Sequence, residues 1–174
     1  MINFYPGPSK TDPGIPTYVA QACRTGIISQ NHRSEAFMKL MKETIHQIRV
    51  KLEVPDSYKI VFTSSATECW EIIAQSLIER KSIHLYNGDF GRKWLEQTNL
   101  LKPESLDMPF SPQQSPSMFI NKIPEDIEML CITQNETSNG TSVSNRILNE
   151  FRVAFPDKLI AIDATSSMAG IYLD

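Results

Sequence analysis

The residues best suited to chemistry in this chain are a carboxylate and several hydroxyl groups that follow short apolar runs. Asp163 ends the apolar run 159–162, and Thr165, Ser166 and Ser167 come directly after it. A run that is apolar at every position is typical of a strand buried on both faces of a parallel sheet. Asp163 would then lie at the carboxyl end of a central strand, where open α/β sheets bind their ligands. An unpaired buried charge is costly, so the position predicts an arginine, a metal ion or a protonated cofactor nitrogen as partner. An aspartate that is merely the first loop residue after a strand remains the alternative.

A second segment combines a predicted strand, small hydroxyl residues and a helix start. Residues 59–62 fit a strand, residues 63–68 have the sequence TSSATE, and a helix is expected over 66–79. Free backbone N–H groups and the positive end of the helix dipole would point at one spot, which is how many proteins bind phosphate. Serine and threonine residues that only cap the helix are an equal alternative.

The alternation of strands and helices predicts an α/β fold with a doubly wound, mostly parallel sheet and helices on both faces. A short helix is expected over 18–24, and a long one follows an N-cap at Ser34. The apolar side chains of the long helix recur at helical spacing and are expected to be core. The remaining expected strands are 82–86, 105–108, 128–133 and 159–162, with helices after residue 94 and over 144–155.

Four loops of this fold would open toward one crevice, because the carboxyl ends of parallel strands meet at one edge of a sheet. The loops are 64–68, 87–94, 135–141 and 163–167. Together they combine hydroxyl groups, aromatic rings and a carboxylate, so they predict a ligand site more strongly than any one of them does.

Composition excludes several other classes of protein. The net charge of −3 argues against a nucleic-acid or anionic-membrane partner, since neither a basic excess nor a basic run exists. The three cysteines have no CxxC spacing, which favours neither disulfides nor a metal site and fits a cytoplasmic location. The chain does not begin like a signal peptide and has no apolar run of the ~20 residues that a membrane span needs. A nucleotide-binding domain is a weaker alternative, because no strand is followed by GxGxxG or GxxxxGK[ST].

Short motifs occur in order along nearly the whole chain: NFYPGPS at 3–9, NHRSEAF at 31–37, NETSNG at 135–140 and DATSS at 163–167. They resemble the opening "NF…GP" segment, the "SHR…EF" helix start, the "NET…G" loop and the "D.SS" strand end of the class V aminotransferases. These are pyridoxal-phosphate enzymes of fold type I, and the likeness is greatest to the phosphoserine aminotransferases among them.

The resemblance implies pyridoxal 5′-phosphate as cofactor and assigns five residues to it. Asp163 would pair with the pyridinium nitrogen and Thr137 would hydrogen-bond the phenolic oxygen. Phe90 would stack on the ring where the family usually has a tryptophan, although it could instead be core. Ala66 and Thr67 would hold the phosphate at the helix start.

For the substrates, an amino acid and a 2-oxo acid, the resemblance implies binding of an anionic group by His32 and Arg33, Arg33 through a bidentate fork. Either residue could instead be an ordinary loop or surface residue. Phosphoserine aminotransferases often carry an arginine at about the position of Ala66. An alanine:glyoxylate or serine:pyruvate type of transaminase therefore remains open. Trp70, Trp94 and His46 are expected to be packing or surface residues.

The family's Schiff-base lysine is expected after Asp163, but the sequence ends at Asp174 without one. Residues 1–16 would be an extended arm, and residues 17–174 an incomplete pyridoxal-phosphate-binding domain without the small carboxyl-terminal domain. The resemblance implies a homodimer in which this chain is a fragment, inactive alone. A degenerate, non-catalytic domain that kept the fold is the alternative.

Overall fold

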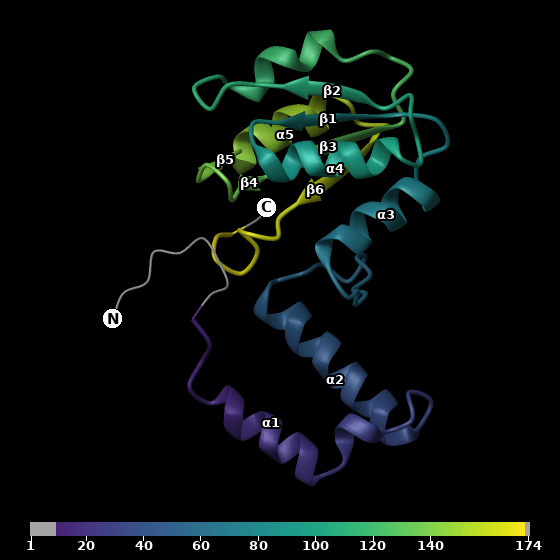
Figure 1. Ribbon diagram of the computed structural model, residues 1–174, viewed down its shortest axis with the longest axis vertical. Helices are drawn as coiled ribbons and strands as arrows, with labels where there is room; N and C mark the ends of the chain where they lie inside the picture. The colour runs from purple at the N-terminus through teal and green to yellow at the C-terminus, as the bar shows by residue number, and fades with distance from the viewer. Residues whose placement is uncertain (1–9, 173–174) are drawn as a thin grey trace. The chain divides into compact units, whose positions relative to one another are not determined.

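The computed structural model describes residues 10–172, which fall into two compact units (Figure 1). The first contains the described residues up to Phe62, and the second contains those from Thr63 onward. The NFYPGPS motif lies outside the described residues, as does most of the predicted arm. No helix in the described part of the chain is both long and apolar enough to cross a membrane.

The first unit consists of helices. It contains α1 (Ile15–Arg24), the short 3-10 helix η1 (Ile27–Ser29) and α2 (Glu35–Lys51). Ser34 caps α2 as predicted, since its hydroxyl accepts a hydrogen bond from the Phe37 N–H at 3.2 Å. The expectation that the apolar stripe of this helix is core was wrong, because no residue of α2 is fully buried. The helical periodicity predicted the helix correctly, but the apolar face of a helix is buried only where another part of the protein packs against it.

The predicted strand 59–62 is not a strand. Val61 is 78% exposed and Phe62 is 53% exposed. A strand requires a neighbouring strand to accept and donate its backbone hydrogen bonds. No segment within residues 10–172 pairs with this one, so its apolar composition alone does not make it a strand.

The second unit is built on a parallel sheet of four strands in the order β2-β1-β3-β6. This confirms the predicted α/β class (Figure 1). Its strands are β1 (Ser82–Tyr86), β2 (Leu106–Pro109), β3 (Met129–Thr133) and β6 (Leu159–Asp163). Its helices are α3 (Ala66–Ser76), α4 (Asp89–Asn99), the 3-10 helix η2 (Pro116–Lys122) and α5 (Asn145–Ala154). The loop expected at 135–141 contains a small hairpin of β4 (Asn135–Glu136) and β5 (Thr141–Ser142).

The two faces of the sheet bury different side chains, because successive residues of a strand point to opposite faces. One face packs aliphatic residues such as Ile83 and Leu130 against Phe151 of α5 and partly buried residues of η2. The other packs Met129 and Cys131 against Trp70 of α3 and Trp94 of α4. Ala161 packs on this second face, and Asp163, two residues later, lies on the same side.

The prediction that 159–162 forms a central strand buried on both faces was wrong. β6 is an edge strand of the described sheet, and β3 is its one neighbour. Leu159 is 50% exposed and Ile162 is 37% exposed. A run of apolar residues records that a strand is suited to burial, and it carries no information on which strands lie beside it.

Helix α4 lies close against β1 because Gly91 has no side chain. A Cβ at this position would lie 2.3 Å from the Cβ of Tyr86 and 2.9 Å from the Thr133 Oγ1. These distances are far below van der Waals contact. Gly91 therefore sets the depth at which the start of α4 sits on the sheet.

Gly91→Ala is expected to destabilise the chain by about 1–3 kcal/mol, because the added methyl group overpacks the contact with β1. Urea unfolding measures the change. Gln97→Ala on the same helix is the control, and it should leave stability within about 0.5 kcal/mol. Equal stability of the Gly91→Ala variant and the parent chain would contradict the tight contact.

Candidate functional site

Asp163 ends β6 with both of its carboxylate oxygens engaged. Its Oδ1 accepts hydrogen bonds from the Thr165 N–H at 3.0 Å and the Thr165 hydroxyl at 2.7 Å. Its Oδ2 accepts one from the Trp70 indole N–H at 3.2 Å. The first two donors come from the loop after β6 and the third from α3, so the orientation of the carboxylate is fixed from two directions.

The loop after β6 also meets the loop that begins at β4. The hydroxyl groups of Thr137 and Ser166 form a hydrogen bond, and the Gln134 N–H donates to the Asp163 carbonyl oxygen at 3.0 Å. Two of the four loops that the sequence predicted to share one edge of the sheet are therefore in direct contact.

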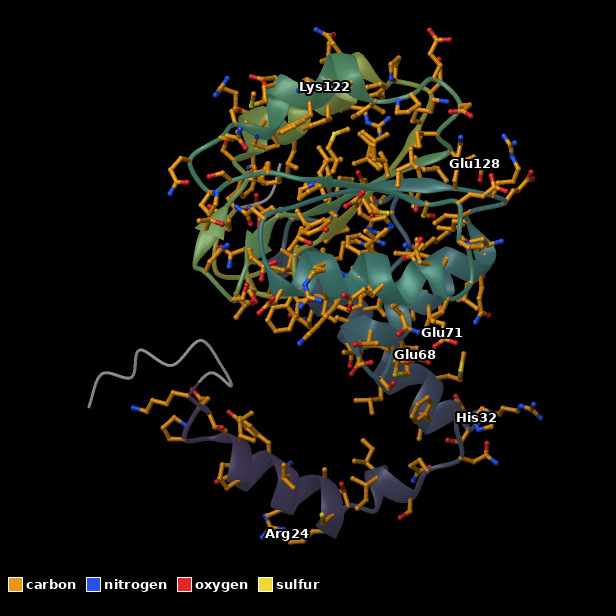
Figure 2. All side chains as sticks on the ribbon, turned by 45° about the horizontal axis from the view of Figure 1, so that its top comes forward. Arg24, His32, Glu68, Glu71, Lys122 and Glu128 are labelled. Carbon is orange, nitrogen blue, oxygen red and sulfur yellow. The ribbon has the colours of Figure 1, made fainter. Side chains whose placement is uncertain are left out.

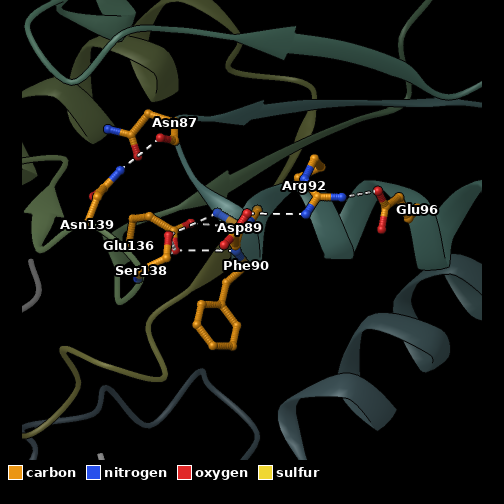
Figure 3. Close-up of polar contacts among 9 residues, drawn as sticks. Asn87, Asp89, Phe90, Arg92, Glu96, Glu136, Ser138 and Asn139 are labelled. Carbon is orange, nitrogen blue, oxygen red and sulfur yellow. Dashed lines mark hydrogen bonds and ion pairs between the residues drawn. The ribbon is translucent and has the colours of Figure 1, made fainter. Parts of the chain in front are cut away.

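A buried glutamate joins the β4 loop to α4 (Figure 3). The Glu136 carboxylate, 1% exposed, accepts hydrogen bonds from the backbone N–H groups of Phe90 (3.3 Å) and Gly91 (3.1 Å). It also accepts from the backbone N–H (3.0 Å) and the hydroxyl (2.7 Å) of Ser138. The Ser138 hydroxyl accepts in turn from the Asp89 N–H at 3.0 Å. The start of α4, which carries Phe90, is thus tied to the segment that carries Thr137.

Charge and space both suit this contact. Burial raises the pKa of Glu136, but the hydrogen bonds from Ser138, Gly91 and Phe90 outweigh burial and hold the pKa below its ordinary value. Gly88 allows the close approach, since a Cβ there would lie 2.4 Å from the Glu136 Cγ. The negative carboxylate also lies at the positive end of the α4 dipole, which stabilises it further.

The ring of Phe90 points away from Glu136 (Figure 3) and is 39% exposed. The Lys93 ammonium lies 5.2 Å from its centroid, one helical turn along α4. The ring is therefore not a core residue, and part of its surface is open to a ligand.

The start of α3 leaves backbone donors open. Ser65 caps the helix by accepting from the Glu68 N–H at 3.1 Å. The Glu68 carboxylate accepts from the Ser64 hydroxyl at 2.7 Å and the Ser64 N–H at 2.6 Å, and these bonds lower the pKa of Glu68. The N–H groups of Ala66 and Thr67 have no acceptor within residues 10–172. Two donors at the positive end of a helix make a suitable site for an anion.

The predicted cofactor-binding residues all belong to the second unit, and most are linked by the contacts above. Asp163 contacts α3 one turn after Thr67, and Thr137 contacts the loop after β6. The predicted substrate-binding residues, His32 and Arg33, lie in the turn before α2 in the first unit, where both are exposed. Figure 2 labels His32.

Two residues with direct contacts at the site were not predicted, Trp70 and Glu136. Trp70 was expected to be a packing or surface residue, and its contact with Asp163 spans 93 positions of sequence. The one indication in the sequence was that Trp70 follows Thr67 by three positions, which places the two residues about one helical turn apart. Glu136 lies inside the NET motif, beside Thr137. No group of three or more metal-ligating side chains occurs in the described part of the chain.

Comparison with known proteins identifies the family of the chain. The family model for aminotransferase class V matches residues 15–174, so the chain belongs to the class V aminotransferase family. The phosphoserine aminotransferase of Corynebacterium glutamicum is 28% identical over 97% of this chain and 43% of its own length. The putative phosphoserine aminotransferase of Mycobacterium leprae is 27% identical over 98% of this chain and 44% of its own length. The chain thus spans less than half the length of these relatives.

Solved structures give the same result for the fold. A phosphoserine aminotransferase from Cytophaga hutchinsonii superposes with a TM-score of 0.89 at 34% identity, covering 98% of this chain and 47% of that one. A pyridoxamine-pyruvate aminotransferase from Mesorhizobium loti superposes with a TM-score of 0.78 at 19% identity, covering 98% and 43%. The second likeness shows the fold alone.

Glu136→Gln is expected to lower the free energy of unfolding by about 1–3 kcal/mol at pH 7, because the amide replaces one acceptor by a donor that faces backbone N–H groups. The lowered pKa of Glu136 means that its contribution is present above the ordinary value of 4.5 and is lost as the pH falls through the folded-state value. The difference between the variant and the parent should therefore shrink below pH 4.5.

Urea unfolding between pH 3 and pH 8 measures this difference. Glu104→Gln, at an exposed position, is the control and should behave like the parent chain. A Glu136→Gln variant as stable as the parent at pH 7, or a difference that is constant with pH, would contradict the role of the charged carboxylate.

Proposed function

We propose that this chain is part of a pyridoxal-phosphate-dependent aminotransferase that transfers an amino group between an amino acid and a 2-oxo acid. The observation that carries the proposal is the Asp163 carboxylate. It is held in a fixed orientation at the carboxyl end of β6 and is linked through α3 to a helix start with open N–H donors. Membership of the aminotransferase family supports the same function.

The residues present fit this cofactor in charge and in hydrogen-bonding type. The open N–H groups of Ala66 and Thr67 suit the phosphate. The Asp163 carboxylate suits a protonated ring nitrogen, and the Thr137 hydroxyl suits the phenolic oxygen. The exposed part of the Phe90 ring is available for stacking, with less area than a tryptophan would give. When bound, pyridoxal phosphate supplies an electron sink for negative charge at the α-carbon of the amino acid.

Each of these residues has a task that follows from its chemistry. Asp163 would keep the ring nitrogen protonated, since a neighbouring carboxylate favours the charged form. Ala66 and Thr67 would hold the phosphate through the helix start, and Phe90 would shield the ring from water. Orientation by several fixed contacts lowers the entropic cost of reaction.

For the substrate, we propose the phosphoserine type, with His32 and Arg33 binding an anionic group. The names of the relatives support this choice, and serine biosynthesis would be the corresponding pathway. Ala66 supplies no cation where phosphoserine aminotransferases often have an arginine. An alanine:glyoxylate or serine:pyruvate transaminase therefore remains the second candidate.

The sequence given has no lysine after Lys158, so we further propose that transamination needs a longer protein than these 174 residues. That protein would act as a cytoplasmic homodimer. A non-catalytic domain that kept the fold is the rival, and it differs in lacking the lysine altogether.

Asp163→Ala is expected to weaken binding of pyridoxal phosphate by about 100-fold or more, because it leaves the ring nitrogen's charge without its partner. Equilibrium dialysis of the 174-residue chain measures the dissociation constant. Asp157→Ala, in the exposed turn at the other end of β6, is the matched control and should bind as the parent does. Equal binding by the two variants would overturn the assignment of Asp163.

The catalytic proposal is tested on the protein made from its complete gene. After treatment with pyridoxal phosphate and borohydride, the intact mass should show one cofactor fixed to one lysine beyond Asp174. Activity on phosphoserine with 2-oxoglutarate should exceed activity on alanine or serine with glyoxylate or pyruvate. A full-length chain of 19.7 kDa without a site-selective adduct would support the non-catalytic rival.

A further inference from the structure

Trp70 is the residue of α3 that reaches the proposed site. Its side chain is 7% exposed, and its indole N–H donates to the Asp163 Oδ2 at 3.2 Å. Thr165 holds the other oxygen of the same carboxylate. Without Trp70, Oδ2 would have no donor among the described residues, and the carboxylate would be held through one oxygen alone.

The indole is itself held by a stack of buried rings. Trp70 lies on Trp94 with ring centroids 6.0 Å apart and an interplanar angle of 14°. The His84 ring meets Trp94 edge-on at 5.3 Å and 89°. Burial lowers the pKa of His84 to about 3, so the ring stays neutral near pH 7 and places no charge on the stack. An aromatic ring at position 94 of α4 thus packs against the Trp70 indole, and His84 of β1 packs against that ring in turn.

Helix α3 connects two parts of the proposed site. The open N–H groups of Ala66 and Thr67 lie at its first turn, and Trp70 follows Thr67 by three positions, on the next turn. An α-helix rises about 1.5 Å per residue, so these groups are held at a fixed separation by one rigid element. One helix thus keeps the proposed phosphate-binding groups at a fixed distance from Trp70, which donates to the Asp163 carboxylate.

We propose that Trp70 is a positioning residue for Asp163, and that its indole N–H holds the carboxylate in the orientation that receives the ring nitrogen of the cofactor. This inference rests on the proposed function. Trp70 does not contact the cofactor in this account. It acts through Asp163, and it links that carboxylate to the helix that binds the phosphate.

Trp94 provides a matched control on the same stack. Its indole N–H is buried without a hydrogen-bond partner in the part of the chain that the structure describes, and its side chain is 1% exposed. Trp→Phe at either position keeps an aromatic ring and removes one N–H. Only at position 70 does that N–H belong to a bond with Asp163. Because Trp94 is the more buried residue, any effect of lost packing should be at least as large there.

The first measurement is made without cofactor. The chain has two tryptophans, so ¹H–¹⁵N spectra should show two indole N–H signals, which Trp70→Phe and Trp94→Phe assign. Asp163→Asn should shift the Trp70 signal and leave the Trp94 signal in place. An unmoved Trp70 signal would overturn the proposal.

The second measurement uses pyridoxamine 5′-phosphate, whose binding does not require a lysine. By calorimetry on the 174-residue chain, Trp70→Phe should weaken binding about 10-fold, or about 1.4 kcal/mol. Trp94→Phe should stay within about 2-fold, which is 0.4 kcal/mol or so. Equal losses in the two variants would overturn the positioning role. If the parent chain binds no pyridoxamine phosphate, the cofactor site proposed on this chain fails, and the indole signals still decide whether Trp70 holds Asp163.

Discussion

The first turn of an α-helix has backbone N–H groups without acceptors inside the helix, and this constraint organises the second unit. Helix α4 has its first three N–H groups satisfied by Ser138 and the buried Glu136 carboxylate. Helix α3 uses a cap at Ser65 for its third N–H and leaves the first two open. One helix start is therefore closed by the protein's own negative charge, while the other is available to an anion from outside. The open N–H groups are the reason why the start of α3, and not that of α4, is the proposed phosphate site.

Side chains alternate along a strand, and this alternation decides which residues lie on the sheet face that packs against α3 and α4. Thr133 and Asp163 are partners in the register of β3 and β6, and both lie on the sheet face that packs against α3 and α4. A shift of one residue in either strand would turn these side chains to the aliphatic face formed with α5 and η2. The fully buried aliphatic residues of β3, Leu130 and Ile132, hold the register in place. The chemistry on one face thus depends on packing at the other.

Local pattern predicted the second unit well and the edges of the sheet poorly. The strand over 82–86 was predicted with its observed bounds, because an apolar run between polar turns can be recognised from neighbouring residues alone. Residues 59–62 and β6 were misjudged because pairing and burial depend on which distant segment lies alongside. Trp70 was missed for the same reason, since its bond to Asp163 joins segments far apart in sequence. Asp163 was singled out by its place after an apolar run, and the family resemblance assigned it to the cofactor together with Thr137 and Phe90. A resemblance to a family contains information on tertiary structure that local propensity lacks.

The stacked tryptophans have a practical consequence for spectroscopy. Both lie in the second unit, so intrinsic tryptophan emission reports on that unit and is silent on the helices of the first. Unfolding followed by emission and unfolding followed by far-ultraviolet circular dichroism would then observe different parts of the chain. Coincident curves from the two probes would mean that the two units unfold as one cooperative body, and separated curves would mean that each unit has a stability of its own. Tryptophan emission, compared with circular dichroism, therefore reports whether the two units unfold cooperatively.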